Sequence, residues 1–415
     1  MKVVITAGGR GTRISTLNST IPKPLFPVNG MPVLEHQIRC LKDQGVTDII
    51  LTIGYLGEQI KNYIGNGGKF GVHVRYIEEK EPLGTAGALY YLKDDIDSDF
   101  FLINGDLIFD VDLKRMMEFH KKNNASATLF VHPNDHPYDS GLIVVDRYSR
   151  VESWLTKEDK RSWYKNSVNA GIHILAPKLL EQMKEPKKTD LDRDILKPRI
   201  ASKDVYAYLS PEYVKDMGTP ERIKMVEYDL LTGYVSQKNL KNKQKAIFLD
   251  RDGTINRYVG FLRNIDQFEL LDGVAEAIKK INRSGYLAIV VTNQPVIARG
   301  ELDWDELNQI HRKMETLLGE EGCYVDDIFV CPHHPDKGFK GEKIEYKIQC
   351  NCRKPAPGLL LQAAEKYNID LSKSWMVGDS ERDIEAGKAA GCNTILVSDT
   401  FNLLNAVEEM DFLRR

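Results

Sequence analysis

Residues 246–254 have the sequence AIFLDRDGT, and residues 3–13 have the sequence VVITAGGRGTR. In each stretch an apolar run, typical of a buried parallel strand, leads directly into a loop rich in aspartate or glycine. Apolar runs and amphipathic segments alternate after both stretches. Because parallel strands need crossover helices, this alternation predicts two α/β domains, each with a mostly parallel, doubly wound sheet.

The length of 415 residues also favours two domains, because it exceeds what one ordinary core supports. Residues 235–244, VSQKNLKNKQ, are polar and predict a linker. We therefore expect a first domain over residues 1–234 and a second domain over residues 245–415. A basic arm that attracts phosphate is the alternative interpretation of the polar stretch.

The composition excludes several classes of partner. The net charge of -3 gives the chain no basic field, so we expect no nucleic-acid partner. No apolar run is long enough to span a bilayer, which predicts no membrane partner. The N-terminus lacks the features of a signal peptide, so we expect a cytoplasmic location. The oligomeric state stays open, a homo-oligomer included.

Several polar segments of the N-terminal half suit a nucleoside triphosphate. The loop Gly8-Gly9-Arg10-Gly11-Thr12-Arg13 offers backbone N–H groups without Cβ obstruction, and Arg13 can fork onto phosphate oxygens. Lys23 lies between two prolines, which hold its backbone stiffly. Gly84-Thr85 form a second close-approach loop, and Asp106 follows a strand at the sheet edge where α/β ligands bind. The alternatives are a surface role for Lys23 and a helix N-cap role for Asp106.

In this order, the segments resemble the sugar-1-phosphate nucleotidyltransferase family, in its guanylyltransferase branch, over nearly all of residues 1–230. The resemblance implies that a sugar 1-phosphate oxygen attacks the α-phosphate of a nucleoside triphosphate and releases pyrophosphate. Catalysis would then consist of positioning and charge neutralisation. One departure is Thr156, which precedes Lys157 where the family often carries Glu. The implied roles are triphosphate stabilisation by Arg13 and Lys23, Mg²⁺ binding by Asp106 and Asp216, sugar-phosphate binding by Lys157, and contacts to sugar hydroxyls by Gly141 and Asn169.

Glu79 is a candidate reader of the nucleotide base. It lies five residues before Gly84, where relatives that use uridine or thymidine nucleotides tend to carry Gln. Guanine presents two adjacent hydrogen-bond donors, and a carboxylate can accept both. We therefore expect GTP as the substrate, with a solvated loop carboxylate as the alternative interpretation of Glu79.

The aspartates after residue 249 predict phosphate-ester chemistry. Asp250 and Asp252 project to the same side of an extended segment, so Asp250 can attack phosphorus while Asp252 protonates the leaving alcohol and later activates water. Mg²⁺ is needed to screen the carboxylates from the phosphate, and we expect Asp250, Asp252 and Asp379 as its ligands, with Asp383 as a further acidic group. Thr292 can donate to a phosphate oxygen, and Lys354 supplies positive charge.

Three cysteines and a histidine form a candidate metal site. Cys331, His333, Cys350 and Cys352 flank a polar loop, and three thiolates with one imidazole make a closed, structural Zn²⁺ site. Cys323 is the rival ligand. Unpaired thiols are the alternative interpretation.

The C-terminal half resembles the haloacid dehalogenase phosphatase superfamily over residues 245–400. Its metal loop is similar to those of heptose 1,7-bisphosphate 7-phosphatases and histidinol-phosphate phosphatases, and the segments that include Asn293 and Arg353-Lys354 are more like the heptose enzymes. Pro295-Val296 depart from that pattern, which favours Ser-Gly. No long insertion follows Asp252 or Thr292, so we expect no large cap domain. We expect Arg353 to bind a distal phosphate.

Together the two resemblances imply a bifunctional enzyme. It would remove the 7-phosphate of D-glycero-D-manno-heptose 1,7-bisphosphate and then transfer GMP from GTP to the heptose 1-phosphate. The product, a GDP-heptose, would serve surface glycan synthesis such as that of lipopolysaccharide. One alternative pairs a mannose or other hexose 1-phosphate guanylyltransferase with a histidinol-phosphate-like or other phosphosugar phosphatase. A second alternative is a non-catalytic regulatory or scaffold protein.

Overall fold

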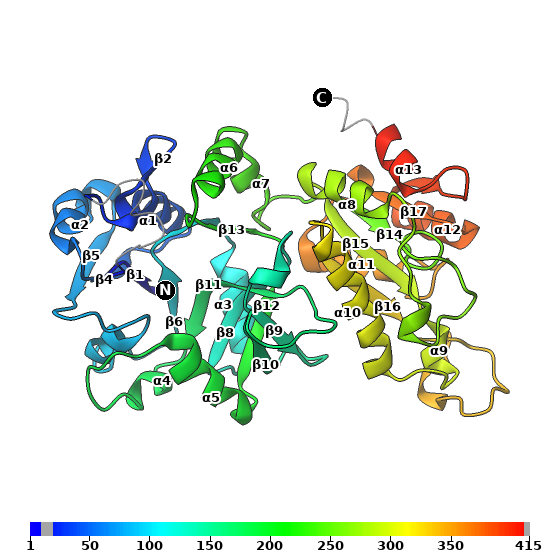
Figure 1. Ribbon diagram of the computed structural model, residues 1–415, viewed down its shortest axis with the longest axis horizontal. Coiled ribbons are helices and arrows are strands. Elements are labelled where there is room, and N and C mark those ends of the chain that lie inside the picture. Colours follow the sequence, from blue (N-terminus) through cyan, green and yellow to red (C-terminus); the bar gives the residue numbers. More distant parts are fainter. Residues whose placement is uncertain (10–19, 411–415) are drawn as a thin grey trace. The chain divides into compact units, whose positions relative to one another are not determined.

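The structure, a computed structural model, describes residues 1–9 and 20–410, and its chain forms two compact units (Figure 1). The first unit comprises Met1–Val131, Ile143–Trp154 and Asn169–Asn239. The second unit comprises Leu240–Arg415 and two segments from the N-terminal half, His132–Leu142 and Leu155–Val168. The predicted fold class of two mostly parallel α/β sheets is confirmed.

A nine-stranded sheet forms the centre of the first unit. Its strands β5, β4, β1 and β6 are parallel neighbours, and β11 runs antiparallel beside β6. The bounds of the sheet strands are β1 Lys2–Thr6, β4 Asp48–Ile53, β5 His73–Glu78, β6 Phe100–Asn104, β8 Ala127–His132, β9 Leu142–Val145, β10 Val151–Leu155, β11 Val168–Leu175 and β12 Val205–Leu209. Two small antiparallel pairs lie outside it: β2 Pro27–Val28 with β3 Met31–Pro32, and β7 Leu107–Asp110 with β13 Tyr213–Asp216.

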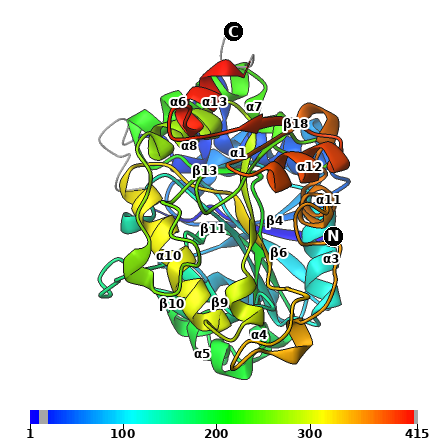
Figure 2. The same ribbon diagram turned by 90° about the vertical axis from the view of Figure 1, so that its right-hand side faces the viewer.

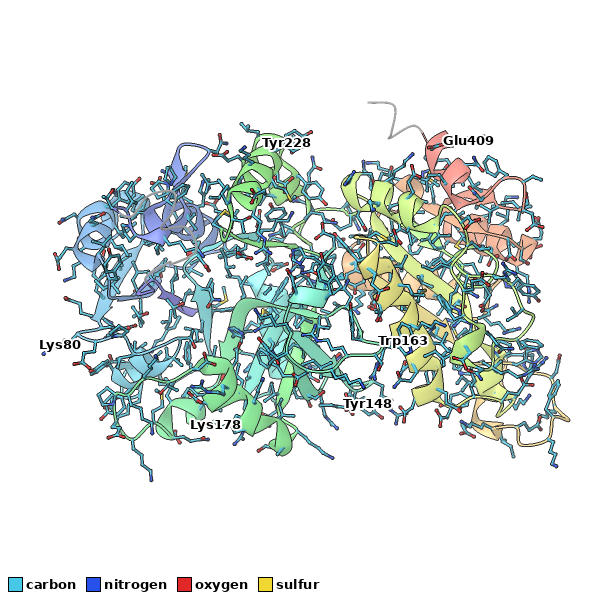
Figure 3. The ribbon with its side chains drawn as sticks, in the orientation of Figure 1. Lys80, Tyr148, Trp163, Lys178, Tyr228 and Glu409 are labelled. Atoms are coloured by element: carbon cyan, nitrogen blue, oxygen red, sulfur yellow. The ribbon has the colours of Figure 1, made fainter. Side chains whose placement is uncertain are left out.

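Alternating side chains of this sheet enter two separate cores. Val3 and Ile5 pack in one core with residues of α1, α2 and α3, whereas Val4 packs in the other with residues of α4 and a 3₁₀ helix at Gly87–Leu92. The exposed face of α6 includes Tyr228, which points outward with 67% of its surface accessible (Figure 3). The helix bounds are α1 Val33–Asp43, α2 Gly57–Ile64, α3 Leu113–Lys122, α4 Lys178–Glu181, α5 Lys197–Arg199, α6 Pro220–Leu231 and α7 Tyr234–Gln237.

The second unit is built on a five-stranded parallel sheet in the order β16-β15-β14-β17-β18. Helices α8, α10 and α13 share one core with Ile247 and Leu249, and helices α11 and α12 share the opposite core with Phe248, so both faces are covered (Figure 2). The bounds are β14 Ala246–Leu249, β15 Leu287–Asn293, β16 Asp327–Cys331, β17 Trp375–Gly378, β18 Asn393–Leu396, α8 Val274–Arg283, α9 Pro295–Ala298, α10 Trp304–Glu320, α11 Gly358–Tyr367, α12 Glu381–Ala390 and α13 Leu403–Glu409.

Both halves of the stretch predicted as a linker are structured. Residues 234–237 form α7, and the first unit continues to Asn239. The second unit begins at Leu240, which is buried in the core shared with α11, and the backbone of Gln244 bonds to Asn368 and Asp370. The apolar side chains within the polar stretch therefore belong to one unit or the other.

No helix within residues 1–9 and 20–410 combines the length and the hydropathy that crossing a bilayer requires.

Candidate active sites

The carboxyl ends of β14 and β17 bring three aspartates of the second unit together. Asp250 follows β14, Asp379 follows β17, and Asp383 lies in the first turn of α12. Each offers an oxygen within 4.8 Å of the others. Mg²⁺ binds through one or two carboxylates in sites of this kind, so the three aspartates fit the ion. Gly253 has φ +86°, and a Cβ there would lie 1.9 Å from Asp379 Oδ2, so this turn requires glycine.

Lys354 neutralises this cluster. Its Nζ lies 2.8 Å from Asp250 Oδ1 and 2.6 Å from Asp383 Oδ1, and only 2% of the lysine side chain is exposed. Burial alone would lower the pKa of Lys354, but the two carboxylates outweigh it and raise that pKa, so the ammonium stays charged. Burial raises the pKa of Asp250 to about 6 against the opposing effect of Lys354. A divalent cation beside Asp250 would favour its ionised, nucleophilic form.

Asp252 lies outside the group of three and is held by its own donors. Its carboxylate accepts hydrogen bonds from Arg251 Nη2 (2.9 Å), Gln294 Nε2 (2.8 Å) and Asn256 Nδ2 (3.1 Å). Burial acts to raise the pKa of Asp252, but Arg251 and these hydrogen bonds dominate and lower it. The side chain is therefore oriented for proton transfer, and its predicted role as a metal ligand stays a prediction.

The sequence analysis missed Arg251, Gln294 and Asn256 as orienting residues. Arg251 has no exposed surface, and its Nη1 lies 3.1 Å from Nε2 of His311. The sequence offers one indication of this role for Arg251, its position between Asp250 and Asp252 at a strand end. A charged side chain buried there needs a charged partner.

The end of β15 orients the neighbouring loop. Thr292 Oγ1 accepts a hydrogen bond from Gln294 Nε2 at 2.8 Å. Asn293 and the backbone of Lys354 exchange two hydrogen bonds, from Asn293 Nδ2 to the Lys354 carbonyl oxygen (3.0 Å) and from the Lys354 N–H to Asn293 Oδ1 (3.1 Å). Asn293 thus fixes the loop that carries Lys354.

A cavity of about 380 Å³ opens onto these carboxylates. Its lining includes the apolar side chains of Phe261, Pro295 and Val296 and two arginines, Arg353 and Arg382. The cavity can therefore admit a phosphorylated molecule with an apolar face and a second anionic group.

The predicted Zn²⁺ ligands come together in the second unit. Sγ of Cys331, Cys350 and Cys352 lie 3.3 to 3.6 Å apart, and His333 Nδ1 lies 3.3 Å from Cys352 Sγ and 3.7 Å from Cys331 Sγ. A tetrahedral Zn²⁺ with Zn–S bonds of about 2.3 Å needs sulfurs about 3.8 Å apart, so the four residues fit this ion. Cys323 is absent from the group; its Sγ bonds to the Leu318 carbonyl oxygen at 3.3 Å.

In the first unit, Asp106 and Asp216 lie on adjoining chain segments. β13 pairs with β7, and the Met217 N–H donates to the Asp106 carbonyl oxygen at 2.9 Å. Asp106 forms an ion pair with Lys23, and Asp216 Oδ2 forms one with Arg222 Nη1 at 2.5 Å. Both predicted metal carboxylates are thus neutralised by cations of the chain.

Glu79 lies beside the glycine-rich loop. A Cβ on Gly8 would stand 3.1 Å from Glu79 Oε1, while Glu79 Oε2 accepts a hydrogen bond from the Leu83 N–H at 3.0 Å. Burial raises the pKa of Glu79. Gly9 has open space where a Cβ would stand. The carboxylate is therefore close to the loop and keeps one oxygen without a described donor.

The loop at Gly84-Thr85 packs against a neighbouring segment. Gly84 has φ +77°, and a Cβ there would lie 2.5 Å from the Thr189 carbonyl oxygen. Thr85 Oγ1 accepts a hydrogen bond from the Leu191 N–H at 2.7 Å. Both residues thereby set the loop's shape, and their contact with a nucleotide stays a prediction.

The remaining predicted residues stay predictions. Lys157 is 66% exposed and lies 4.0 Å from Glu158, Gly141 immediately precedes β9, and Asn169 Oδ1 lies 3.2 Å from His173 Nε2. Gly11, Thr12 and Arg13 lie outside the described residues.

Comparison with known proteins identifies relatives for each half. The family model Nucleotidyl transferase matches residues 2–233, and the model HAD-hydrolase-like matches residues 351–407. D-glycero-beta-D-manno-heptose-1,7-bisphosphate 7-phosphatase of Pasteurella multocida is 47% identical over 155 residues, which are 37% of this chain and 82% of that protein.

Two further comparisons cover more than half of the chain each. The probable mannose-1-phosphate guanylyltransferase 1 of Oryza sativa is 34% identical over 358 residues, 80% of this chain and 96% of that protein. The crystal structure of HddC from Yersinia pseudotuberculosis is 30% identical and has a TM-score of 0.49, covering 55% of this chain and 99% of that one.

We expect Lys354→Met to lower the rate of phosphomonoester hydrolysis by about 100-fold or more, because one lost charge-stabilising donor typically costs that much. It should also destabilise the second unit by about 3–5 kcal/mol, since the substitution leaves buried carboxylates unpaired. Steady-state hydrolysis and calorimetry of the full chain measure the two effects. Lys366→Met, which breaks a half-exposed ion pair with Asp327, is the matched control. Equal hydrolysis rates in the two variants would contradict the role of Lys354.

Proposed function

Since the chain belongs to the nucleotidyl transferase family and, in its second half, to the family of heptose-bisphosphate 7-phosphatases, we propose that it makes a GDP-heptose in two steps. The second unit removes the 7-phosphate of D-glycero-D-manno-heptose 1,7-bisphosphate, and the first attaches GMP to the remaining 1-phosphate. The observation that carries the proposal is the cluster of Asp250, Asp379 and Asp383 around Lys354, beside an oriented Asp252.

In the phosphatase step, an oxygen of Asp250 attacks the phosphorus at C7 and the bond from phosphorus to the C7 oxygen breaks. Asp252, in its protonated form, delivers a proton to that oxygen, and the resulting carboxylate then takes one from the water that hydrolyses the aspartyl phosphate. Lys354 and the Thr292 hydroxyl stabilise the phosphate oxygens. The three-aspartate cluster would hold Mg²⁺, which would neutralise charge between the carboxylates and the phosphate.

In the transferase step, the sugar 1-phosphate oxygen bonds to the α-phosphorus of GTP and pyrophosphate leaves. Lys23 and Arg13 neutralise the triphosphate, and Asp106 with Asp216 hold the second Mg²⁺. Lys157 binds the sugar phosphate. Contacts to the sugar hydroxyls come from Gly141 and Asn169, and nucleotide contacts come from Gly8, Gly9, Gly11, Thr12, Glu79, Gly84 and Thr85.

A hexose substrate is the second candidate. The relative that covers 80% of this chain bears the name of a mannose-1-phosphate guanylyltransferase, which supports a mannose 1-phosphate in the first unit. The heptose route explains why a bisphosphatase is fused to the transferase, since its product is the sugar 1-phosphate that the transferase uses. We place the enzyme in the cytoplasm and its product in lipopolysaccharide synthesis.

The order of the steps can be measured on the full chain. With heptose 1,7-bisphosphate, GTP and Mg²⁺, we expect phosphate release to precede pyrophosphate release. Asp250→Asn should abolish both, because no 1-phosphate forms, and added heptose 1-phosphate should restore pyrophosphate release alone. Asp106→Asn should have the converse effect, so that phosphate is released but pyrophosphate is not. Phosphate without subsequent pyrophosphate in the unaltered enzyme would contradict the heptose assignment of the first unit.

Glu79 should set the base preference. We expect pyrophosphate release with GTP to exceed that with ATP, CTP and UTP, and Glu79→Gln to lower the GTP preference about tenfold, because an amide cannot accept both guanine donors. The matched control is Glu78→Gln, because Glu78 is the exposed neighbour and pairs with Lys61. A preference for ATP, CTP or UTP in the unaltered enzyme would refute the assignment of GTP.

A structural Zn²⁺ should occupy the cysteine-histidine group. We expect about one zinc per purified chain, lost in Cys350→Ser together with phosphatase stability, because structural zinc contributes folding free energy. Cys323→Ser should retain zinc, since Cys323 lies outside the group. Elemental analysis measures the zinc content, and loss of phosphatase activity on heating measures the stability. Unchanged zinc content in Cys350→Ser would show that the ligands are different.

A further inference from the structure

Two arginines line the cavity above the phosphatase aspartates. Arg353 immediately precedes Lys354, and Arg382 is the second residue of α12. Both share the cavity with Asp250 and Asp252. They come from segments far apart in the sequence, the cysteine-histidine loop and a helix, yet present guanidinium groups to one space.

Few of their hydrogen-bond donors are used. Arg353 Nη1 donates to the His333 carbonyl oxygen at 3.2 Å, and Arg382 Nε donates to Ser380 Oγ at 3.4 Å. Within residues 1–9 and 20–410, neither arginine forms an ion pair with a carboxylate. Because a guanidinium carries five N–H donors in a planar fork, most of both groups stays available to a ligand.

The other cationic side chains near these aspartates already form ion pairs. Lys354 pairs with Asp250 and Asp383, and Arg251 pairs with Asp252. Arg353 and Arg382 are therefore positive charges beyond those that the catalytic carboxylates neutralise. Such an arrangement costs free energy that a bound anion offsets.

The reacting phosphate cannot be that anion alone, because it must sit at Asp250 with Lys354. A second anionic group would lie in the same cavity, near the two arginines. The apolar lining residues, which include Phe261, Pro295 and Val296, suit the carbon face of a sugar.

We propose that Arg382, acting with Arg353, binds the phosphate that is not hydrolysed, and that Arg382 thereby sets the preference for a bisphosphorylated sugar over a monoester. The inference rests on the proposed phosphatase function. Because the bound phosphate does not react, its contacts are equal in the ground state and the transition state. Loss of Arg382 therefore raises KM and leaves kcat nearly constant.

The test uses the full chain with heptose 1,7-bisphosphate and, as a substrate without a second phosphate, p-nitrophenyl phosphate. In Arg382→Gln we expect KM for the bisphosphate to rise about tenfold or more, as for a lost charge-assisted hydrogen bond. The ratio of kcat/KM for the bisphosphate to kcat/KM for the monoester should fall by the same factor. Arg382→Lys should recover part of this ratio, because an ammonium keeps the charge but loses the fork. Lys388→Gln, an exposed lysine of the same helix, is the control and should match the unaltered enzyme.

The outcomes distinguish a failure of this inference from a failure of the proposed phosphatase function. An unaltered enzyme that hydrolyses the monoester as efficiently as the bisphosphate would overturn the proposed function and this inference together. A clear bisphosphate preference that Arg382→Gln leaves intact would overturn the inference alone. An equal fall of kcat/KM for both substrates would also overturn it, because that pattern indicates a structural role.

Discussion

The buried ion pairs of Lys354 hold the second unit's candidate active site together. One ammonium bridges Asp250 at the end of β14 and Asp383 in the first turn of α12. The backbone of the same lysine is tied to Asn293 at the end of β15. Three elements therefore meet at Lys354, β14 and α12 through its ammonium group and β15 through its backbone. Since unpaired buried carboxylates are unfavourable, these elements keep their positions relative to one another only while that charge is present.

The cysteine-histidine loop determines where this charge lies. Cys352 is two residues before Lys354, and the four donor atoms of the loop are close enough to share one ion. A metal there would fix the loop's backbone without entering the chemistry. The proposed metal ligands and the proposed phosphate-binding lysine are thus neighbours on one loop.

Charge pairing at both candidate sites follows one physical rule. In the first unit, Lys23 pairs with Asp106, and Arg222 pairs with Asp216. In the second unit, Lys354 and Arg251 neutralise the aspartates. Carboxylates that must meet phosphate need a compensating cation, from the chain or from a metal. Arg353 and Arg382 differ because they have no carboxylate partner among the described residues.

The sequence by itself determined the class of the fold and named the candidate residues for the chemistry. Apolar strands ending in glycine or aspartate predicted two mostly parallel sheets, because this alternation is a local property of strands and turns. Only the tertiary structure decided the partners. It placed Asp383 beside Asp250, bonded Asn293 to the Lys354 loop and separated Asp252 from the acidic group. It also assigned Val235 and Leu240 to different units, although their polar surroundings predicted a linker. Contacts between residues distant in sequence depend on how helices pack across a sheet, and no local pattern encodes that packing.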